Sequence, residues 1–295
     1  ETGVSGFTGG IASVEKGRKK VDSESVLALI GAPQREHIAY ASTILGGVPA
    51  GIKALTDEPF GARAVIYSLL LSREDGVCRR QMEGLARKAD KAVFEETKKC
   101  LDEVRALDSR FVLPVVDLAI SSLKELSTGQ FEQFEANVGY LVEADNEIDL
   151  FEFTLQRIIF RRLVPKFRRV SHKSVQFYSI KPVMGNIVTL ISCLAYWGAD
   201  EEAEASQAFE TAMRRLNVKA DHRIAAVGEC GLQALDEALA RLVLVTPLVR
   251  KRVLDASVTC IAADGYVKYE EAELLRAVAD SLDCPIPPLF AGETV

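Results

Sequence analysis

The sequence has few of the residues and motifs that mark a metal or nucleophile site. Its three histidines, His37, His172 and His222, lie far apart, and none has a second His or a Cys at metal-ligand spacing. The motifs H-E-x-x-H, G-x-S-x-G and G-x-x-x-x-G-K-[ST] are absent, as is a G-x-G-x-x-G following a strand. We therefore expect no catalytic or cofactor-binding residue in this chain.

Cysteine usage and net charge argue against two further classes of protein, those stabilised by disulfides and those that bind nucleic acid. The six cysteines include no C-x-x-C, and the closest pairs are more than twenty residues apart. With no secretory apolar segment at the start, this favours reduced, buried thiols in a cytosolic protein. The net charge of −6 and pI near 5.4 argue against a nucleic-acid partner. The chain opens with Glu-Thr-Gly rather than Met, so we expect a fragment of a longer protein.

Strand patterns are also lacking, because no run of alternating β-branched residues occurs. From Ser25 onward, apolar residues recur at helical spacing between Pro, Gly or Asp boundaries. This predicts an all-α fold of one or more multi-helix bundles. The expected helices are 35–47, 60–72, 79–91, 93–106, 111–126, 130–143, 150–163, 183–197, 202–216, 231–245, 248–262 and 269–282.

Composition suggests how these helices are grouped. A chain of 295 residues with 48% hydrophobic content supports one large domain or two smaller ones. The Gly- and Ser-rich start predicts a flexible linker, and two prolines, Pro165 and Pro182, interrupt the helical pattern. We expect a linker, an N-terminal helical domain, a basic connection and a C-terminal helical domain, at 1–24, 25–165, 166–181 and 182–295.

One apolar stretch, 182–199, follows basic residues and raises the possibility of a membrane span. It is short, it contains Asn186, Thr189 and Ser192, and an acidic run follows it. A buried core helix is the favoured interpretation.

Three segments resemble copies of one helical hairpin: 257–279, 138–158 and, less closely, 67–87. Aligning Asp264 with Asp145 also matches Val267 with Ile148 and Glu271 with Glu152, while the third copy has Asp75-Gly76 at the turn and Met82 in place of the glutamate. We expect Gly265, Gly76 or Asn146 to supply a positive φ, the apolar residue to enter the core and the acids to stabilise the next helix start.

The same turns can be compared with a calcium-binding loop, which needs oxygen ligands at fixed positions. Starting from Asp264, four of five ligand or glycine positions hold unsuitable residues. The 138–158 copy fits better, with Asp145, Glu147 and Asp149 as the candidate cation ligands, although Leu150 and Gln156 follow at the later positions. The structural interpretation is favoured, and the cation site is kept as the alternative.

Charge is concentrated in one region. No Asp or Glu occurs between Thr154 and Ala199, which hold eight positive charges and leave about −14 on the rest of the chain. Phe160, Phe167, Phe177 and Tyr178 are interleaved with these charges. A basic and aromatic segment could contact anionic lipid, an acidic partner protein or another part of this chain, or it could be a solvated connection. The predicted interaction residues are Arg161, Arg162, Lys166, Arg168, Arg169 and Lys173.

Three strings together, 30–72, 136–159 and 262–289, resemble the long C-terminal extension of a subgroup of bacterial HtpX-like membrane zinc metallopeptidases (peptidase family M forty-eight). The hairpins at Asp145/Glu152 and Asp264/Glu271 are also similar to those of TerB-like tellurite-resistance helical domains. The resemblance implies a non-catalytic accessory region that follows a protease domain on the cytoplasmic side of the inner membrane. It implies that zinc is bound only by that protease domain, and that the partners are the protease domain, other proteins or an anionic membrane surface. The alternative is a TerB-like module that responds to divalent cations, and an autonomous enzyme is the less favoured third interpretation.

Overall fold

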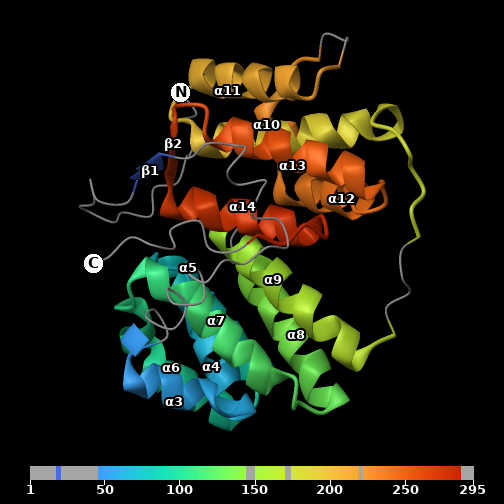
Figure 1. Cartoon of the computed structure of the whole chain (residues 1–295). Helices are drawn as coiled ribbons and strands as arrows, with labels where there is room; N and C mark the ends of the chain where they lie inside the picture. Colours follow the sequence, from blue (N-terminus) through green and yellow to red (C-terminus); the bar gives the residue numbers. More distant parts are fainter. Residues whose placement is uncertain (1–17, 21–45, 144–149, 170–173, 219–221, 287–295) are drawn as a thin grey trace. The chain divides into compact units, whose positions relative to one another are not determined.

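The computed structural model of the chain describes residues 18–20, 46–143, 150–169, 174–218 and 222–286 (Figure 1). In these residues it contains twelve α-helices and two three-residue strands, so the prediction of an all-α, multi-helix fold is confirmed. The chain forms two compact units. We call Ile38–Ser171 the N-unit, and His172–Val295 together with the segment that carries Arg18–Lys20 the C-unit.

Seven helices form the described part of the N-unit. They are α3 (Ala50–Thr56), α4 (Pro59–Leu69), α5 (Asp75–Lys88), α6 (Lys91–Arg105), α7 (Ser109–Leu123), α8 (Thr128–Glu143) and α9 (Leu150–Phe167). Helix α4 is the most buried of them, and it packs against α3, α6 and α7.

Local capping explains where several of these helices begin. The Asp90 carboxylate accepts from the Ala92 amide at 3.0 Å at the start of α6, and Asp108 does the same for α7. At the start of α8, Ser127 and Gln130 form a reciprocal capping box, in which each side chain bonds the other's amide. Such caps satisfy amides that have no partner inside the helix.

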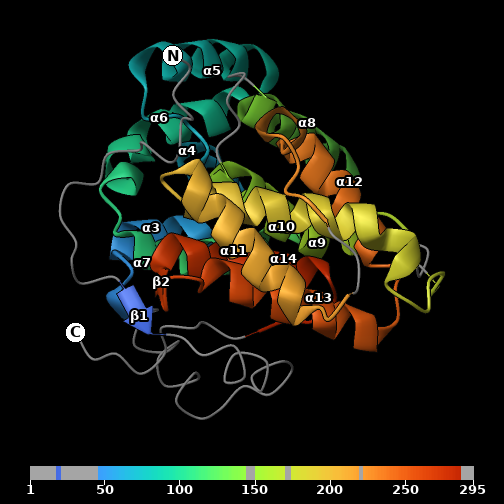
Figure 2. The same cartoon turned by 90° about the horizontal axis from the view of Figure 1, so that it is seen from above.

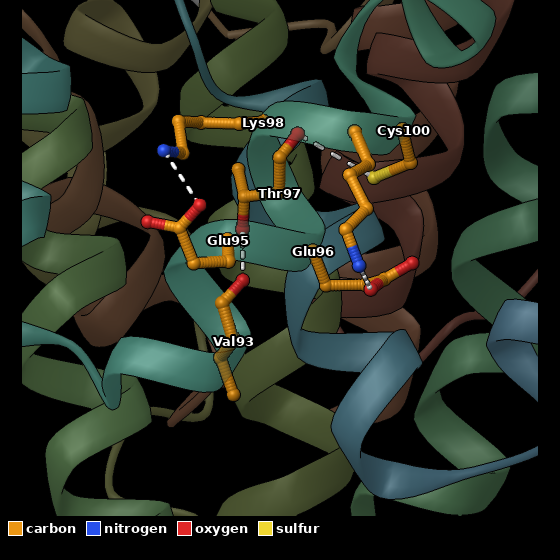
Figure 3. Close-up of polar contacts among 7 residues, drawn as sticks. Val93, Glu95, Glu96, Thr97, Lys98 and Cys100 are labelled. Atoms are coloured by element: carbon orange, nitrogen blue, oxygen red, sulfur yellow. Dashed lines mark hydrogen bonds and ion pairs between the residues drawn. The ribbon is translucent and has the colours of Figure 1, made fainter.

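Helix α6 shows how polar residues are divided between its two faces (Figure 3). On the exposed face Lys98 pairs with Glu95 at 2.6 Å, a contact that contributes little to stability in water. On the buried face the Thr97 hydroxyl donates to the Val93 carbonyl at 2.8 Å, and the Cys100 thiol lies 3.6 Å from the Thr97 carbonyl. Ser68 of α4 reaches the same carbonyl at 3.3 Å, which joins α4 to α6 without leaving a buried hydroxyl unpaired.

The C-unit is built around α10. Its elements are β1 (Arg18–Lys20), a 3₁₀ turn η1 (Lys181–Val183), α10 (Met184–Gly198), α11 (Glu202–Arg215), a 3₁₀ turn η2 (Val227–Glu229), α12 (Leu232–Leu242), α13 (Pro247–Ile261), β2 (Tyr266–Lys268) and α14 (Tyr269–Ser281). Helix α10 packs against α11, α12 and α13 (Figure 1 and Figure 2). Eight of its residues are buried, so the interpretation of 182–199 as a core helix is confirmed. Among the described residues, no helix combines the length and apolar character needed to cross a bilayer.

The structure contains two short strands, although the sequence predicted none. Residues Arg18–Lys20, inside the segment expected to be a linker, pair antiparallel with Tyr266–Lys268, with Lys19 opposite Val267. No alternating apolar pattern marks either strand in the sequence. The pairing joins a segment near the start of the chain to the hairpin between α13 and α14.

Candidate functional site

The predicted basic surface lies on α9 and the residues directly after it. The apolar side of α9 is committed to the N-unit core, where Leu155, Ile159 and Leu163 are fully buried. Arg162 and Lys166 follow Leu155 and Ile159 by seven residues, so they lie on the same helical stripe, but nearer the C-terminal end of α9, where both are exposed.

Two aromatic residues of α9, Phe160 and Phe167, pack against α8. Phe167 stacks on Phe131 of α8 with ring centroids 4.3 Å apart, and Phe160 contacts both Phe131 and Phe134 edge-on. The interleaved aromatic pattern, considered in the sequence as a possible lipid contact, is thus internal packing at these two positions. Phe177 and Tyr178 lie in the C-unit and are treated below.

Two of the predicted interaction residues are held by ion pairs inside the N-unit. Arg168 makes a two-pronged contact with Glu135 of α8, at 3.0 and 2.5 Å, and Arg162 pairs with Asp117 of α7. Both arginines remain partly exposed. Sequence reasoning missed these pairs because their acidic partners lie far away in the chain.

The remaining predicted cations are distributed unevenly. Lys166 and Arg169 are exposed, Arg161 is half-buried, and Lys173 lies outside the described residues. Arg162 and Lys166 are four residues apart on α9, which places them on one side of the helix, and Arg169 follows two residues after the helix ends. We call these three residues the basic ridge. It groups three exposed basic residues at and just beyond the C-terminal end of α9, which suits contact with an acidic surface.

The alternative cation ligands, Asp145, Glu147 and Asp149, lie outside the described residues. Across the part of the chain that the structure describes, no group of three or more His, Cys, Asp or Glu side chains is placed to hold a metal ion.

The hairpin at Asp264 uses its polar groups to build the turn. Gly265 has φ of +83°, as predicted. The Asp264 carboxylate accepts from the Tyr266 amide at 2.9 Å, and the Glu271 carboxylate accepts from the Lys268 amide at 2.7 Å, which caps α14. Val267 between them is 1% exposed. Gly265 at the turn, the buried Val267 and the capping Glu271 therefore have the structural roles expected from the sequence.

Gly265 is the position at which this hairpin is most sensitive to substitution. We expect Gly265→Ala to lower the free energy of unfolding by about 1–2 kcal/mol, because an L-residue pays that much in the left-handed region. Gly228 has no positive φ and no atom within 4 Å of an added Cβ, so Gly228→Ala is the matched control. Urea unfolding and hydrogen exchange of α14 measure the difference; equal stabilities of the two variants would contradict it.

The 67–87 segment, which was expected to be the least similar copy of the hairpin, differs from the Asp264 hairpin. Asp75 and Gly76 form the first turn of α5, with Glu74 preceding them, instead of making the corner between two helices. The prediction that Gly76 supplies a positive φ is therefore wrong. The expected start of this helix, at residue 79, was late for the same reason.

The residue that organises this corner is Gln81, which sequence reasoning did not single out. Its amide nitrogen donates to the carbonyls of Leu70 and Leu141, at 3.2 and 2.8 Å, and its oxygen accepts from the Ser72 amide at 2.8 Å. A signal was present in the sequence, because Gln81 shares a helical face with the buried Val77 and Leu85. A glutamine on an apolar stripe needs buried polar partners.

The cysteines are all free, and five of the six are buried. Burial raises the pKa of Cys260 to about 12. A hydrogen bond between Cys193 and Cys230 raises the pKa of Cys193 and lowers that of Cys230. These environments keep Cys193 and Cys260 protonated and unreactive at neutral pH.

No protein-family model, curated protein or solved structure matches this chain.

Proposed function

We propose that this chain is a non-catalytic interaction region and that the basic ridge of Arg162, Lys166 and Arg169 docks an acidic protein surface. The observation that supports this is the exposure of positive charge at the C-terminal end of α9. Leu155, Ile159 and Leu163 are buried in the N-unit core, whereas Lys166 of α9 and Arg169, two residues beyond it, are exposed to solvent. Exposed charges of one sign steer association and select complementary partners.

From the sequence resemblance, we further propose that the region belongs to an HtpX-like membrane zinc metallopeptidase. It would act on the cytoplasmic side of the inner membrane and would regulate the attached protease domain or present substrates and partners to it. The C-terminal hairpin supports the TerB-like part of this proposal, since Gly265, Val267 and Glu271 fill the turn, plug and capping positions.

The test compares the complete open reading frame that contains this chain with charge-reversed variants. We expect Lys166→Glu combined with Arg169→Glu to change kcat/KM for a folded protein substrate by about tenfold or more. Hydrolysis of a short peptide should stay unchanged, because the ridge acts on docking and not on bond cleavage. The matched control is Arg87→Glu combined with Lys124→Glu, two exposed cations of the same unit.

Three results would overturn this proposal. One is hydrolase activity in the isolated chain that depends on its own residues. Another is an equal effect of the ridge variant and the control variant on protein cleavage. The third is a rise in melting temperature with millimolar calcium that Asp145→Asn abolishes, which would identify a cation-responsive module instead.

A further inference from the structure

A second surface, in the C-unit, combines exposed apolar side chains with positive charge. Tyr178 and Leu248 are 78% and 72% exposed, and they are the two most exposed large hydrophobic residues in the described part of the chain. Single exposed apolar residues are common on proteins, so exposure alone carries no argument. Tyr178 and Leu248 are of interest because the two segments that carry them lie side by side.

Main-chain contacts bring the segments of Tyr178 and Leu248 together. Phe177 forms a parallel bridge with Val245, and the Thr246 amide donates to the Phe177 carbonyl at 3.1 Å. Tyr178 follows Phe177 directly, and Leu248 lies in the first turn of α13, two residues beyond Thr246. The segment leading to α10 thus runs beside the corner between α12 and α13 (Figure 1). The two exposed apolar residues therefore lie on segments that main-chain hydrogen bonds hold together.

Positive charge surrounds this corner. The Arg241 guanidinium lies 4.9 Å from the centre of the Phe177 ring. Lys251 is one turn from Leu248 on α13, and Lys181 follows Tyr178 by three residues. All three are exposed, and within the described residues none has an ion-pair partner. The stretches 174–199 and 238–254 contain no Asp or Glu.

We propose that this corner, formed by Tyr178, Leu248, Lys181, Arg241 and Lys251, binds the surface of an anionic lipid bilayer. Tyrosine prefers the level of the lipid headgroups, and a projecting leucine can enter the acyl boundary beside it. Lysine and arginine keep their charges among the phosphates while their alkyl stems lie against apolar material. The corner is independent of the basic ridge and of the proposed function.

Two features favour a bilayer over an acidic protein. The apolar contribution is two separate protruding side chains, whereas protein interfaces concentrate their energy in packed pockets at the centre of a larger patch. Two side chains also fall well short of the roughly 1,000 Å² that a specific protein interface buries. A bilayer needs no pocket, because it deforms around an inserted side chain.

The experiment measures partitioning of the full chain onto vesicles by flotation. Vesicles of phosphatidylcholine with 30% phosphatidylglycerol are compared with pure phosphatidylcholine, at low and high sodium chloride. We expect binding to the anionic vesicles at low salt and its loss at high salt, because salt screens exposed charges. Arg241→Gln combined with Lys251→Gln should weaken partitioning about 25-fold, since each cation contributes about fivefold. Tyr178→Ser combined with Leu248→Ser should weaken it at least tenfold.

Matched controls use exposed residues elsewhere in the C-unit. Val227→Ser with Tyr266→Ser removes the other two exposed large hydrophobic residues of the described part of the chain, and Arg214→Gln with Arg223→Gln removes two other exposed cations. Both controls should bind vesicles like the wild type, as should the ridge variant of the N-unit. Equal binding to neutral and anionic vesicles, no binding at low salt, or equal losses in corner and control variants would each overturn the proposal.

Discussion

Replacement of Gln81 by leucine is expected to lower the free energy of unfolding of the N-unit by about 2–4 kcal/mol. The side chain is 1% exposed and makes three hydrogen bonds to main-chain groups. Leucine fills most of the volume, so cavity formation is a minor part of the cost. The main part is the loss of partners for the Leu70 and Leu141 carbonyls and the Ser72 amide, because a buried polar group left unpaired costs about 1–3 kcal/mol.

The matched control is Gln133→Leu on α8. Gln133 also donates to a main-chain carbonyl, that of Lys88 at 3.0 Å, but it is exposed and water can replace it. We expect a change of less than about 1 kcal/mol there. Urea unfolding gives the stability difference, and hydrogen exchange of the α5 and α8 amides locates it. Similar small losses in both variants would show that the buried hydrogen bonds of Gln81 add no stability.

The role of Gln81 shows that the Asp75 and Asp264 corners are built by different interactions. In the Asp264 hairpin the turn is built by an Asx contact, a positive-φ glycine and a capping glutamate. In the Asp75 segment those roles are absent, and a buried glutamine ties the corner to α8 instead. The two corners therefore share an Asp-Gly dipeptide but reach their geometry by different means.

The helices were predictable because the signals that set them are local. The expected 93–106 and 150–163 correspond to α6 and α9, whose bounds differ from the expected ones by at most four residues at either end. Apolar spacing and the acids before each helix are visible in the chain. Helix α3 was missed because it has seven residues and follows a proline and two glycines, which suggest a turn.

What the sequence could not supply was the pairing of distant residues. Strand β1 consists of three consecutive cations and acquires its conformation from β2, far along the chain. At and just after the end of α9 the charges were visible, but not that Asp117 and Glu135 form ion pairs with two of them. The same limit applied to the aromatic residues. Phe167 and Tyr178 look alike in the sequence, yet Phe167 stacks on the buried Phe131, whereas Tyr178 is 78% exposed.

The second large effect concerns Gly61 in α4, where replacement by alanine is expected to lower the free energy of unfolding. Inside a helix, Gly→Ala normally raises stability by up to about 1 kcal/mol. At Gly61 an added Cβ would lie 2.2 Å from the Leu55 carbonyl oxygen of α3 and 2.9 Å from its Cα. These are main-chain atoms, so no rotamer change relieves the overlap, and α3 must move away from α4. We expect a loss of about 2–4 kcal/mol, in the upper range for overpacking.

Gly139 of α8 supplies the opposite case, because no atom lies within 4 Å of its added Cβ. Gly139→Ala should raise the free energy of unfolding by about 0.5–1 kcal/mol, so the two glycine-to-alanine changes are predicted to differ in sign. Urea unfolding monitored by circular dichroism measures both. Stabilisation by Gly61→Ala would mean that α3 is not held against α4 in solution. Loss of stability at Gly61 together with a gain at Gly139 would show that helix contact, and not helix propensity, selects glycine at position 61.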